Sequence, residues 1–429
     1  MRDELLGRPA KDQDFVVPGV GYDELRDALA VHGRVEDLEV AGRRVGLRLY
    51  PSDRTLRRLA PAGIEFAPPR TERSTGPGRH DFEIVASPEI SLEQDMERRD
   101  FTINAIAKRL ETGELLDPFH GQQDLSARVL RTVTPDSFRE DPLRLVRGLR
   151  FVSQHDLEPD EQTLAQMREN AESVRLVSAE RIGGGLSSDG MGELSKLLLG
   201  DHPAKALRLA RDTGVLVALI PEYAPAIGRE LTNDRQHLPL DEHHFAVVQA
   251  AADDGAPLSV RLAALLHDLG KVDADGHEHA ELATETARAV LGRLRYPTRL
   301  RRRVTAIVAN HDHPVPDAEP LTARRALATF GDEVALDIAR HKIADVQGKR
   351  VPDEEVELMR RWLLALESAR AEPHRLSDLA IDGGDLMSLG LAEGPRIGEL
   401  LATLLERVVE DPALNSRERL LEEARSLSR

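Results

Sequence analysis

The chain has 429 residues and a formal net charge of −17, with 41% hydrophobic and 31% charged residues. Because this length exceeds what one hydrophobic core usually accommodates, we expect two to four domains. The absence of cysteine excludes disulfides and thiolate metal sites, so any metal must be held by His, Asp or Glu. No segment is typical of a signal peptide or has the roughly 18 apolar residues of a membrane span, and we therefore expect a cytoplasmic protein without membrane association.

The acidic balance alone argues against nucleic-acid binding, but the basic residues are clustered. Residues 288–303 contain seven arginines and residues 139–150 contain four. Such clusters can form a local groove for phosphates on an acidic protein. The alternative is that these arginines lie on solvated helix faces.

Residues up to about 130 mix strand and helix patterns. DFVV (14–17), RRVGLRLY (43–50) and GIEFA (63–67) predict short strands, and YDELRDALAVHG (22–33) predicts an amphipathic helix. The stretch 69–80 is rich in Gly, Pro and charge, which predicts a mobile loop.

After about residue 135 the apolar spacing is helical throughout. The clearest predicted helices are 141–155, 161–173, 203–215, 258–270, 280–294 and 355–370. Residues 183–192 (GGGLSSDGMG) predict a flexible interruption, and 370–375 predicts a joint before a C-terminal helical unit. The chain is therefore expected to be α+β, with its strands near the N-terminus.

Two aspartates, Asp12 and Asp14, stand one residue apart in KDQDFVV. On a strand residues i and i+2 point the same way, whereas on a helix they lie about 200° apart. A strand here would let both carboxylates bind Mg²⁺ together with substrate phosphates, and Glu65 could add a third carboxylate from a neighbouring strand. A solvated pair of turn acids is the alternative.

Several motifs occur in order along the chain: RDELLGRPAKDQDF (2–15), RRDFTINAIA (98–107), LLDPFHGQQDL (115–125), REDPLRLVRGLRF (139–151), VSAERIGGGLSSDGMGELSKLLLG (177–200) and IDGGDLMSLGLAEGPRIGELLATLLE (381–406). In this combination the chain resembles the class II tRNA nucleotidyltransferase and bacterial poly(A) polymerase family. The resemblance implies a small mixed β-sheet head of the DNA-polymerase-beta type over 1–130. It also implies an all-α neck (131–225), body (226–350) and tail (351–429) that hold the tRNA acceptor end.

The activity implied by the resemblance is addition of C and A to tRNA 3′ ends from CTP and ATP without a nucleic-acid template. Asp141 and Arg144 would be neighbours on one helix face, at i and i+3. A carboxylate accepts from the exocyclic amino group of cytosine or adenine, and a guanidinium donates to the adjacent ring nitrogen. Uracil and guanine present a carbonyl there, so this pair can act as a protein template. An ordinary surface ion pair is the alternative.

Further nucleotide contacts follow from the same resemblance. Arg98 and Arg99 match paired arginines that would hold triphosphate or ribose, and Asn104 would contact the sugar. Arg147 and Arg150 follow Arg144 on the expected helix and are candidates for triphosphate contacts. Asp100 is either part of this set or a residue that holds an arginine in place.

A second constellation lies in the helical part. The His267–Asp268 pair ends an apolar helix, and burying these side chains is costly unless they are paired or bind metal. RLAALLHDLGK (261–271) and LDEHHFAVVQA (240–250) resemble the HD phosphohydrolase superfamily. That resemblance implies a divalent transition metal held by His243, His267, Asp268 and Asp345, with His279 and His311 as further ligands where two metals bind. It implies phosphatase or 2′,3′-cyclic phosphodiesterase activity.

The family's first motif is normally preceded by a short strand and two glycines. Here Met1 stands where the valine before Arg2 is expected, so we expect an upstream start. Two other functions stay open: a poly(A) polymerase, and an HD phosphohydrolase whose degenerate head only binds RNA. The shared motifs leave open whether CCA, CC or A is added.

Overall fold

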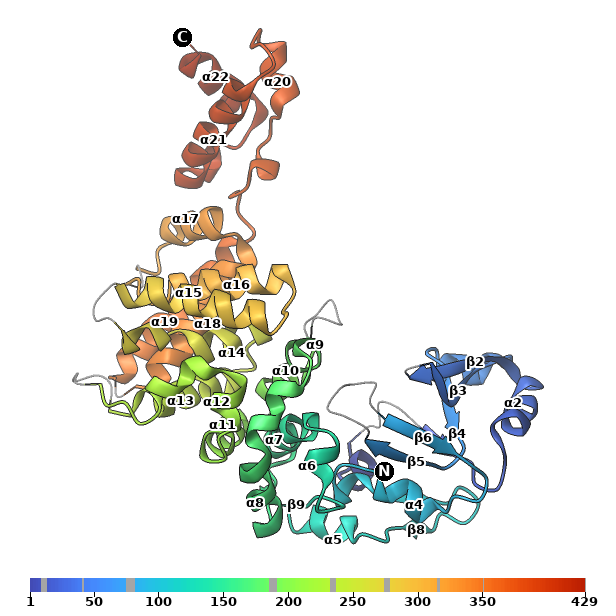
Figure 1. Ribbon diagram of the computed structural model, residues 1–429. Coiled ribbons are helices and arrows are strands. Elements are labelled where there is room, and N and C mark those ends of the chain that lie inside the picture. Colours follow the sequence, from blue (N-terminus) through green and yellow to red (C-terminus); the bar gives the residue numbers. More distant parts are fainter. Residues whose placement is uncertain are drawn as a thin grey trace. The chain divides into compact units, whose positions relative to one another are not determined.

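The computed structural model describes residues 1–8, 14–40, 42–74, 82–184, 191–231, 237–273, 278–314, 317–349 and 351–428 (Figure 1). The chain divides into two compact units. The first comprises Met1–Pro221 and Leu294–Tyr296, and the second comprises Glu222–Arg293 and Pro297–Arg429. Each unit is described by itself below.

The first unit begins with a four-stranded sheet in the order β1-β4-β3-β2. Its strands are β1 (Asp14–Val16), β2 (Gly33–Val40), β3 (Arg43–Pro51) and β4 (Ile64–Ala67). β1 pairs with β4 in parallel, and the other pairings are antiparallel. Because alternate residues of a strand share a face, Leu47 and Leu49 of β3 both bury against Leu25 and Leu29 of α2 (Tyr22–Ala30).

The prediction of a mobile loop over 69–80 is wrong for residues 70–74. Residues Arg70–Ser74 form β5, which pairs antiparallel with β6 (Phe82–Ala86). The Gly and Pro residues that suggested a loop fall between these two strands in the sequence, at 76–78, outside the described residues. Strand β2 was also not predicted.

The first unit also contains several short helices and strands. They are α1 (Arg2–Leu5), α3 (Arg54–Leu59), α4 (Leu92–Glu97), β7 (Ala107–Lys108), β8 (Leu115–Leu116), α5 (Gly121–Ser126), β9 (Val129–Leu130) and β10 (Glu158–Pro159). The following helices are α6 (Ser137–Glu140), α7 (Leu143–His155), α8 (Glu161–Asn170), α9 (Ala179–Gly183), α10 (Glu193–Leu198), α11 (Pro203–Asp212) and α12 (Val215–Leu219).

Helix α7 forms the centre of this helical part. Its apolar face packs Phe151 edge-on against Phe101, with ring centroids 5.7 Å apart. A Cβ added at Gly148 would lie 3.0 Å from the Phe101 ring, so glycine allows the helix to approach this closely. The polar residues of the same helix are thereby held beside the segment 98–104.

Among the described residues of the second unit, the regular secondary structure consists of helices. Its helices are α13 (Leu240–Asp253), α14 (Leu258–Leu266), α15 (Glu278–Arg293), α16 (Thr298–Ala309), α17 (Pro320–Phe330), α18 (Asp332–Gln347), α19 (Asp353–Ala369), α20 (Gly383–Ser388), α21 (Pro395–Glu410) and α22 (Arg417–Leu427). The predicted α+β class, with strands first and helices after, is confirmed. Within the described ranges every helix is too short or too polar to span a bilayer.

Candidate active sites

A cavity of about 710 Å³ in the first unit gathers most of the residues predicted to bind nucleotide. Seven arginines and five carboxylates are among its lining residues, which are Met1, Arg2, Asp3, Asp14, Glu72, Arg98, Arg99, Asp100, Asn104, Ile106, Asp141, Arg144, Arg147, Arg150, Phe151 and Arg181. Of the predicted residues, Glu65 does not line the cavity and Asp12 lies outside the described residues. So many guanidinium groups around one cavity suit a polyanionic ligand.

Asp14 lies at the start of β1, on an exposed position beside β4. Its partner in the parallel register is Glu65, and paired residues of neighbouring strands project on the same face. The Glu65 carboxylate forms an ion pair with Arg48 of β3. The two carboxylates are thus neighbours in the sheet, as hard oxygen ligands for Mg²⁺ require, but Arg48 partly neutralises Glu65.

Arg98 and Arg99 are held by an acid that the sequence analysis missed. Asp95, only 2% exposed, accepts hydrogen bonds from Arg98 Nε at 3.1 Å and Nη2 at 2.9 Å. Arg98 Nη1 also donates to Glu72 at 3.0 Å, and Arg99 Nη1 donates to the Asn104 carbonyl at 2.9 Å. Burial lowers the pKa of Arg99, and the charge of Asp95 opposes this effect. The spacing of Asp95 from both arginines, at i+3 and i+4, was a readable signal.

Asp100 holds Arg147 of α7 in place. Its Oδ2 accepts from Arg147 Nε at 2.8 Å and Nη2 at 2.6 Å, and its Oδ1 accepts from Asn104 Nδ2 at 2.8 Å. Burial would raise the pKa of Asp100, but the Arg147 charge and these hydrogen bonds lower it below its ordinary value. Asn104 in turn accepts from Arg2 Nη1 at 2.8 Å, so one chain of contacts links four lining residues.

Asp141 and Arg144 both line the cavity, but Asp141 is not on the helix as predicted. It has an extended backbone (φ −140°, ψ 100°) just before α7, and its Oδ1 accepts from the Leu143 amide at 3.0 Å. The reason is Pro142, which disfavours helical backbone at the residue before it. Arg144 is 8% exposed and donates to Ser137 Oγ at 3.0 Å and to the Arg98 carbonyl at 2.7 Å.

Arg150 has a partner that the sequence analysis did not identify. Its Nε lies 3.0 Å from Oε2 of the buried Glu193 on α10, and its guanidinium lies 4.3 Å from the Phe151 ring centroid. Arg181 of α9 is also a missed lining residue, with Nη2 3.3 Å from Asp141 Oδ2. Both contacts join residues far apart in the sequence.

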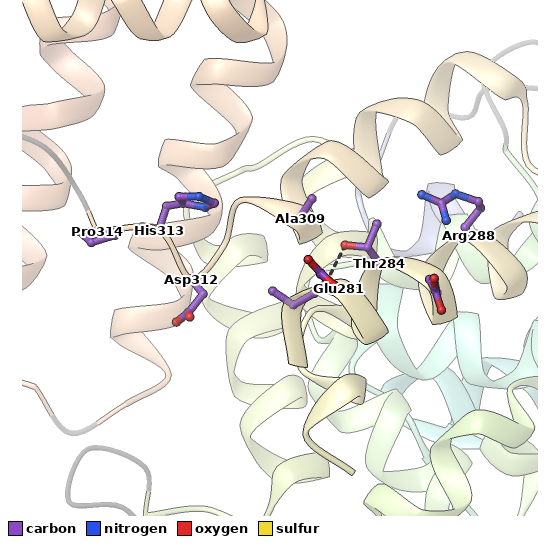
Figure 2. A pocket seen from close by; sticks show the side chains of 9 residues that line it. Glu281, Thr284, Arg288, Ala309, Asp312, His313 and Pro314 are labelled. Atoms are coloured by element: carbon purple, nitrogen blue, oxygen red, sulfur yellow. Dashed lines mark hydrogen bonds between the residues drawn. The ribbon is translucent and has the colours of Figure 1, made fainter. Parts of the chain in front are cut away.

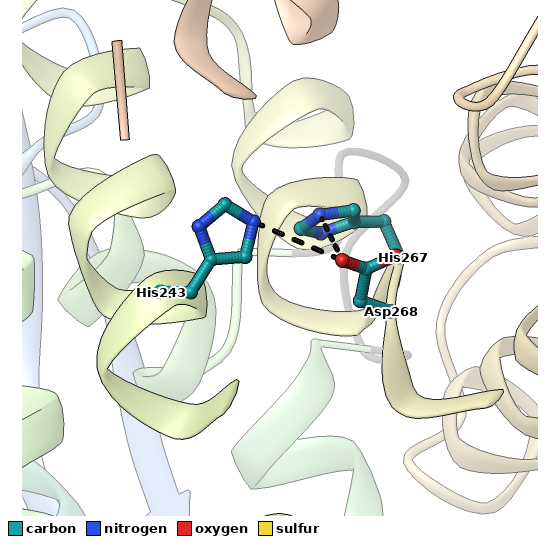
Figure 3. A group of neighbouring side chains, drawn as sticks. All are labelled: His243, His267 and Asp268. Atoms are coloured by element: carbon teal, nitrogen blue, oxygen red, sulfur yellow. Dashed lines mark ion pairs between the residues drawn. The ribbon is translucent and has the colours of Figure 1, made fainter. Parts of the chain in front are cut away.

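The second unit contains the predicted histidine and aspartate cluster. His243 of α13 and the His267–Asp268 pair after α14 point toward one another, as Figure 3 shows. Asp268 Oδ2 lies 3.8 Å from His243 Nε2 and 3.3 Å from His267 Nε2. Asp345 of α18 joins them, with its Oδ1 3.1 Å from His243 Nε2.

The other oxygen of Asp268 faces a second group of possible ligands, which consists of His279 and His311. Asp268 Oδ1 lies 3.1 Å from His311 Nε2 and 3.6 Å from His279 Nε2. Asp268 therefore stands between two sets of nitrogen and oxygen atoms. This is the arrangement in which one carboxylate can bridge two cations.

The tautomers fit metal binding. His267 Nδ1 lies 3.0 Å from the Ala264 carbonyl and His311 Nδ1 lies 2.6 Å from the Val308 carbonyl, so in each ring Nδ1 carries a proton and Nε2 is the nitrogen that faces the carboxylates. His311 Nε2 is 3.2 Å from His279 Nε2. Two imidazole nitrogens face each other so closely only when a proton or a cation lies between them.

The charges of the first group, which consists of His243, His267, Asp268 and Asp345, also suit a bound cation. Burial lowers the pKa of His267, but the neighbouring carboxylates of Asp268 and Asp345 outweigh it and raise this pKa to about 9. Lys271 Nζ donates to Asp268 Oδ2 at 2.6 Å. His243 Nδ1, His243 Nε2, His267 Nε2 and Asp345 Oδ1 are buried, and in spite of the short separations between them none makes a hydrogen bond of acceptable geometry among the described residues. A divalent cation would satisfy these atoms and displace the proton.

A cavity of about 500 Å³ lies beside the second group. Figure 2 shows Glu281, Thr284 and Arg288 of α15 on one side and Asp312 with His313 on the other. Its lining residues Ala280 and Asp312 directly follow His279 and His311 in the chain.

Comparisons with known proteins cover most of the chain. A family model described as the poly(A) polymerase head domain matches residues 1–131. A model for the RNA and SrmB binding site of polymerase A matches 156–227, and a model for domain 2 of tRNA nucleotidyltransferases matches 278–424.

Curated relatives and solved structures agree with these models. The Multifunctional CCA protein of Neisseria gonorrhoeae is 34% identical over 391 residues, which is 86% of this chain and 87% of the relative. That of Ectopseudomonas mendocina is 38% identical over 282 residues, 63% of this chain and 61% of the relative. The Bacillus stearothermophilus CCA-adding enzyme in complex with CTP has a TM-score of 0.69 and 25% identity, covering 100% of this chain and 91% of that one. The Thermotoga maritima CCA-adding enzyme with tRNA, at 21% identity, a TM-score of 0.57 and coverage of 100% and 89%, shares the fold.

Proposed function

Because the chain belongs to the family of CCA-adding tRNA nucleotidyltransferases and poly(A) polymerases, we propose that it adds C and A to tRNA 3′ ends from CTP and ATP without a nucleic-acid template. The observation that carries this proposal is the arginine-lined cavity, with Asp141 and Arg144 on its wall. We propose the cytoplasm, where tRNA is available, as the site of this activity.

Four arginines would bind the triphosphate. One cavity is lined by Arg98, Arg99, Arg147 and Arg150. Ion pairs with neighbouring acidic side chains orient the guanidinium groups, which still line the cavity. Asp100 acts through Arg147 and is thus a positioning residue. Asn104 faces the same cavity and would contact the sugar.

Asp141 and Arg144 would read the base. The Asp141 carboxylate is oriented by the Leu143 amide and by Arg181, which leaves lone pairs to accept from the amino group of cytosine or adenine. Arg144 is held rigidly by Ser137 and the Arg98 carbonyl, and would donate to the adjacent ring nitrogen. A hydrogen-bonding pair of this kind typically contributes ~1–3 kcal/mol of discrimination.

Nucleotidyltransferases of this kind depend on a divalent metal. We propose Mg²⁺, held by Asp12 and Asp14 with Glu65 beside them, because these are hard oxygen ligands. Such a cation would neutralise charge on the phosphates and activate the RNA 3′-hydroxyl. That hydroxyl attacks the α-phosphorus, and pyrophosphate leaves while the arginines of the cavity hold it.

Incorporation of labelled CTP and ATP tests this function. Three tRNA substrates are used: one without CCA, one ending in CC, and one complete. Addition of C and then A only to the incomplete tRNAs is the expected result. Extension of many RNAs with A would instead indicate a poly(A) polymerase, and absence of incorporation would indicate a head that only binds RNA.

A second activity is favoured by the facing Nε2 atoms of His279 and His311. We propose that the second unit is an HD-type metal-dependent phosphohydrolase acting on 2′,3′-cyclic phosphates or phosphomonoesters. His243, His267, Asp268 and Asp345 would hold one divalent transition metal, and Asp268 would share a second with His279 and His311. Metals of this type supply a hydroxide nucleophile and polarise the phosphoester.

Hydrolysis of 2′,3′-cyclic AMP tests this activity. His267→Ala and Asp268→Ala are expected to abolish hydrolysis while CMP addition is retained, since the two sites draw on separate units. His237→Ala is the matched control, because its side chain is exposed and lines neither of the two cavities. Loss of both activities in a folded variant would contradict two independent sites.

A further inference from the structure

One further histidine lies at the metal cluster of the second unit. His341 of α18 is fully buried, and neither of its ring nitrogens has a hydrogen-bond partner within the described residues. By contrast, His267 and His311 each have Nδ1 next to a backbone carbonyl, as described above. Leaving a buried polar group unpaired is costly, and a bound ion would satisfy one of these two nitrogens.

The position of His341 indicates which ligand that is. Its ring centroid lies 4.9 Å from that of His267 and 6.2 Å from that of His311. His341 therefore lies nearer to His267, which belongs to the group with His243 and Asp345, than to His311 of the other group.

The helix supports the same assignment. His341 and Asp345 are four residues apart on α18 and therefore lie on one face, one turn apart. Asp345 Oδ1 is 3.5 Å from His267 Nε2. His341 thus has a neighbour in the first group both along its own helix and across to α14.

We propose that His341 is an additional ligand of the ion held by His243, His267, Asp268 and Asp345. This inference rests on the phosphohydrolase site proposed above. With three imidazoles and two carboxylates, the donor set favours Zn²⁺, Fe²⁺ or a similar transition metal over Mg²⁺, which prefers oxygen.

Zn²⁺ affinity of the full chain, measured by competition with a chromophoric chelator, tests this role. His341→Gln is expected to raise the Kd at least tenfold. His374→Gln is the matched control, because His374 is equally buried but pairs with Asp332 outside the cluster. Circular dichroism and CMP addition report whether each variant is folded.

The outcomes separate this inference from the proposed function. If the parent protein binds no Zn²⁺, the proposed phosphohydrolase site itself is contradicted. If the parent binds Zn²⁺ and the Kd of His341→Gln lies within twofold of the parent value, only the role of His341 is overturned. The same holds if His341→Gln loses hydrolysis while its Zn²⁺ affinity is unchanged. X-ray absorption of the parent with one equivalent of Zn²⁺ needs no variant: three imidazole ligands are expected, and two would overturn the assignment.

Discussion

Arg181 Nη2 lies 3.3 Å from Asp141 Oδ2, while Asp141 Oδ1 accepts from the Leu143 amide at 3.0 Å. Both oxygens of this carboxylate are therefore oriented by the protein before any nucleotide binds. The Leu143 contact comes from the start of α7, whereas Arg181 comes from α9, 40 residues after Asp141. Arg181 is thus placed to set the direction in which Asp141 meets a base.

Arg181→Ala is expected to lower the preference for CTP over UTP about tenfold, because Asp141 Oδ2 loses the cation that orients it. The ratio of CMP to UMP incorporation on a tRNA without CCA measures this effect. Arg175→Ala is the matched control, since Arg175 is exposed and pairs with Glu172. A preference that stays at the parent value in Arg181→Ala would exclude a role in base selection.

Asp141→Ala and Arg144→Ala are expected to relax base choice more than they weaken tRNA affinity. Without the charged side chain, the site no longer favours the amino group of cytosine or adenine over the carbonyl of uracil or guanine. Arg144→Ala should also destabilise the first unit by about 1–3 kcal/mol, since it leaves buried partners unpaired. UTP and CTP incorporation are compared with tRNA affinity and urea unfolding. Equal losses with both nucleotides would contradict the protein-template hypothesis.

Asp12→Ala and Asp14→Ala are each expected to reduce nucleotide addition at least ~100-fold with tRNA affinity nearly unchanged, because these carboxylates would bind metal rather than RNA. Single-turnover incorporation and filter binding provide the two measurements. Asp23→Ala, an exposed carboxylate on α2, serves as control. Addition within about tenfold of the parent in both variants would remove the metal role.

Asp100 predicts a specific pH dependence of stability. Its folded-state pKa lies below the ordinary value of 3.8, so the ionised carboxylate stabilises the fold above that pH. This contribution is lost as the pH falls from 3.8 through the folded-state pKa.

Urea unfolding between pH 5 and 3 measures this effect. The parent should lose unfolding free energy more steeply than Asp100→Asn, by up to one proton or about 1.4 kcal/mol per pH unit. Asp23→Asn, which changes an exposed carboxylate, should follow the parent. Parallel curves for the parent and Asp100→Asn would show that the Asp100–Arg147 pair does not stabilise the fold.

Sequence patterns predicted the helices and strands well where one apolar face, readable from the spacing of the residues, determines the secondary structure. The apolar spacing of 203–215 and 280–294 corresponds to α11 and α15, because helix periodicity depends only on neighbouring residues. The same holds for DFVV and GIEFA, which form β1 and β4. The strand over Arg70–Ser74 was missed, because its stability comes from pairing with β6 rather than from its own charged side chains.

By itself, the sequence determined the fold class, the order of the motifs and most residues of the two candidate sites. Only the tertiary structure decided that Arg150 meets Glu193 and that Arg98 meets Glu72, because these pairs join residues far apart in the chain. It also placed Arg181 on the wall of the first cavity and His341 next to His267. A motif records the identity and spacing of neighbours, whereas ion pairs and ligand sets depend on distances between helices, which are set by how buried side chains pack.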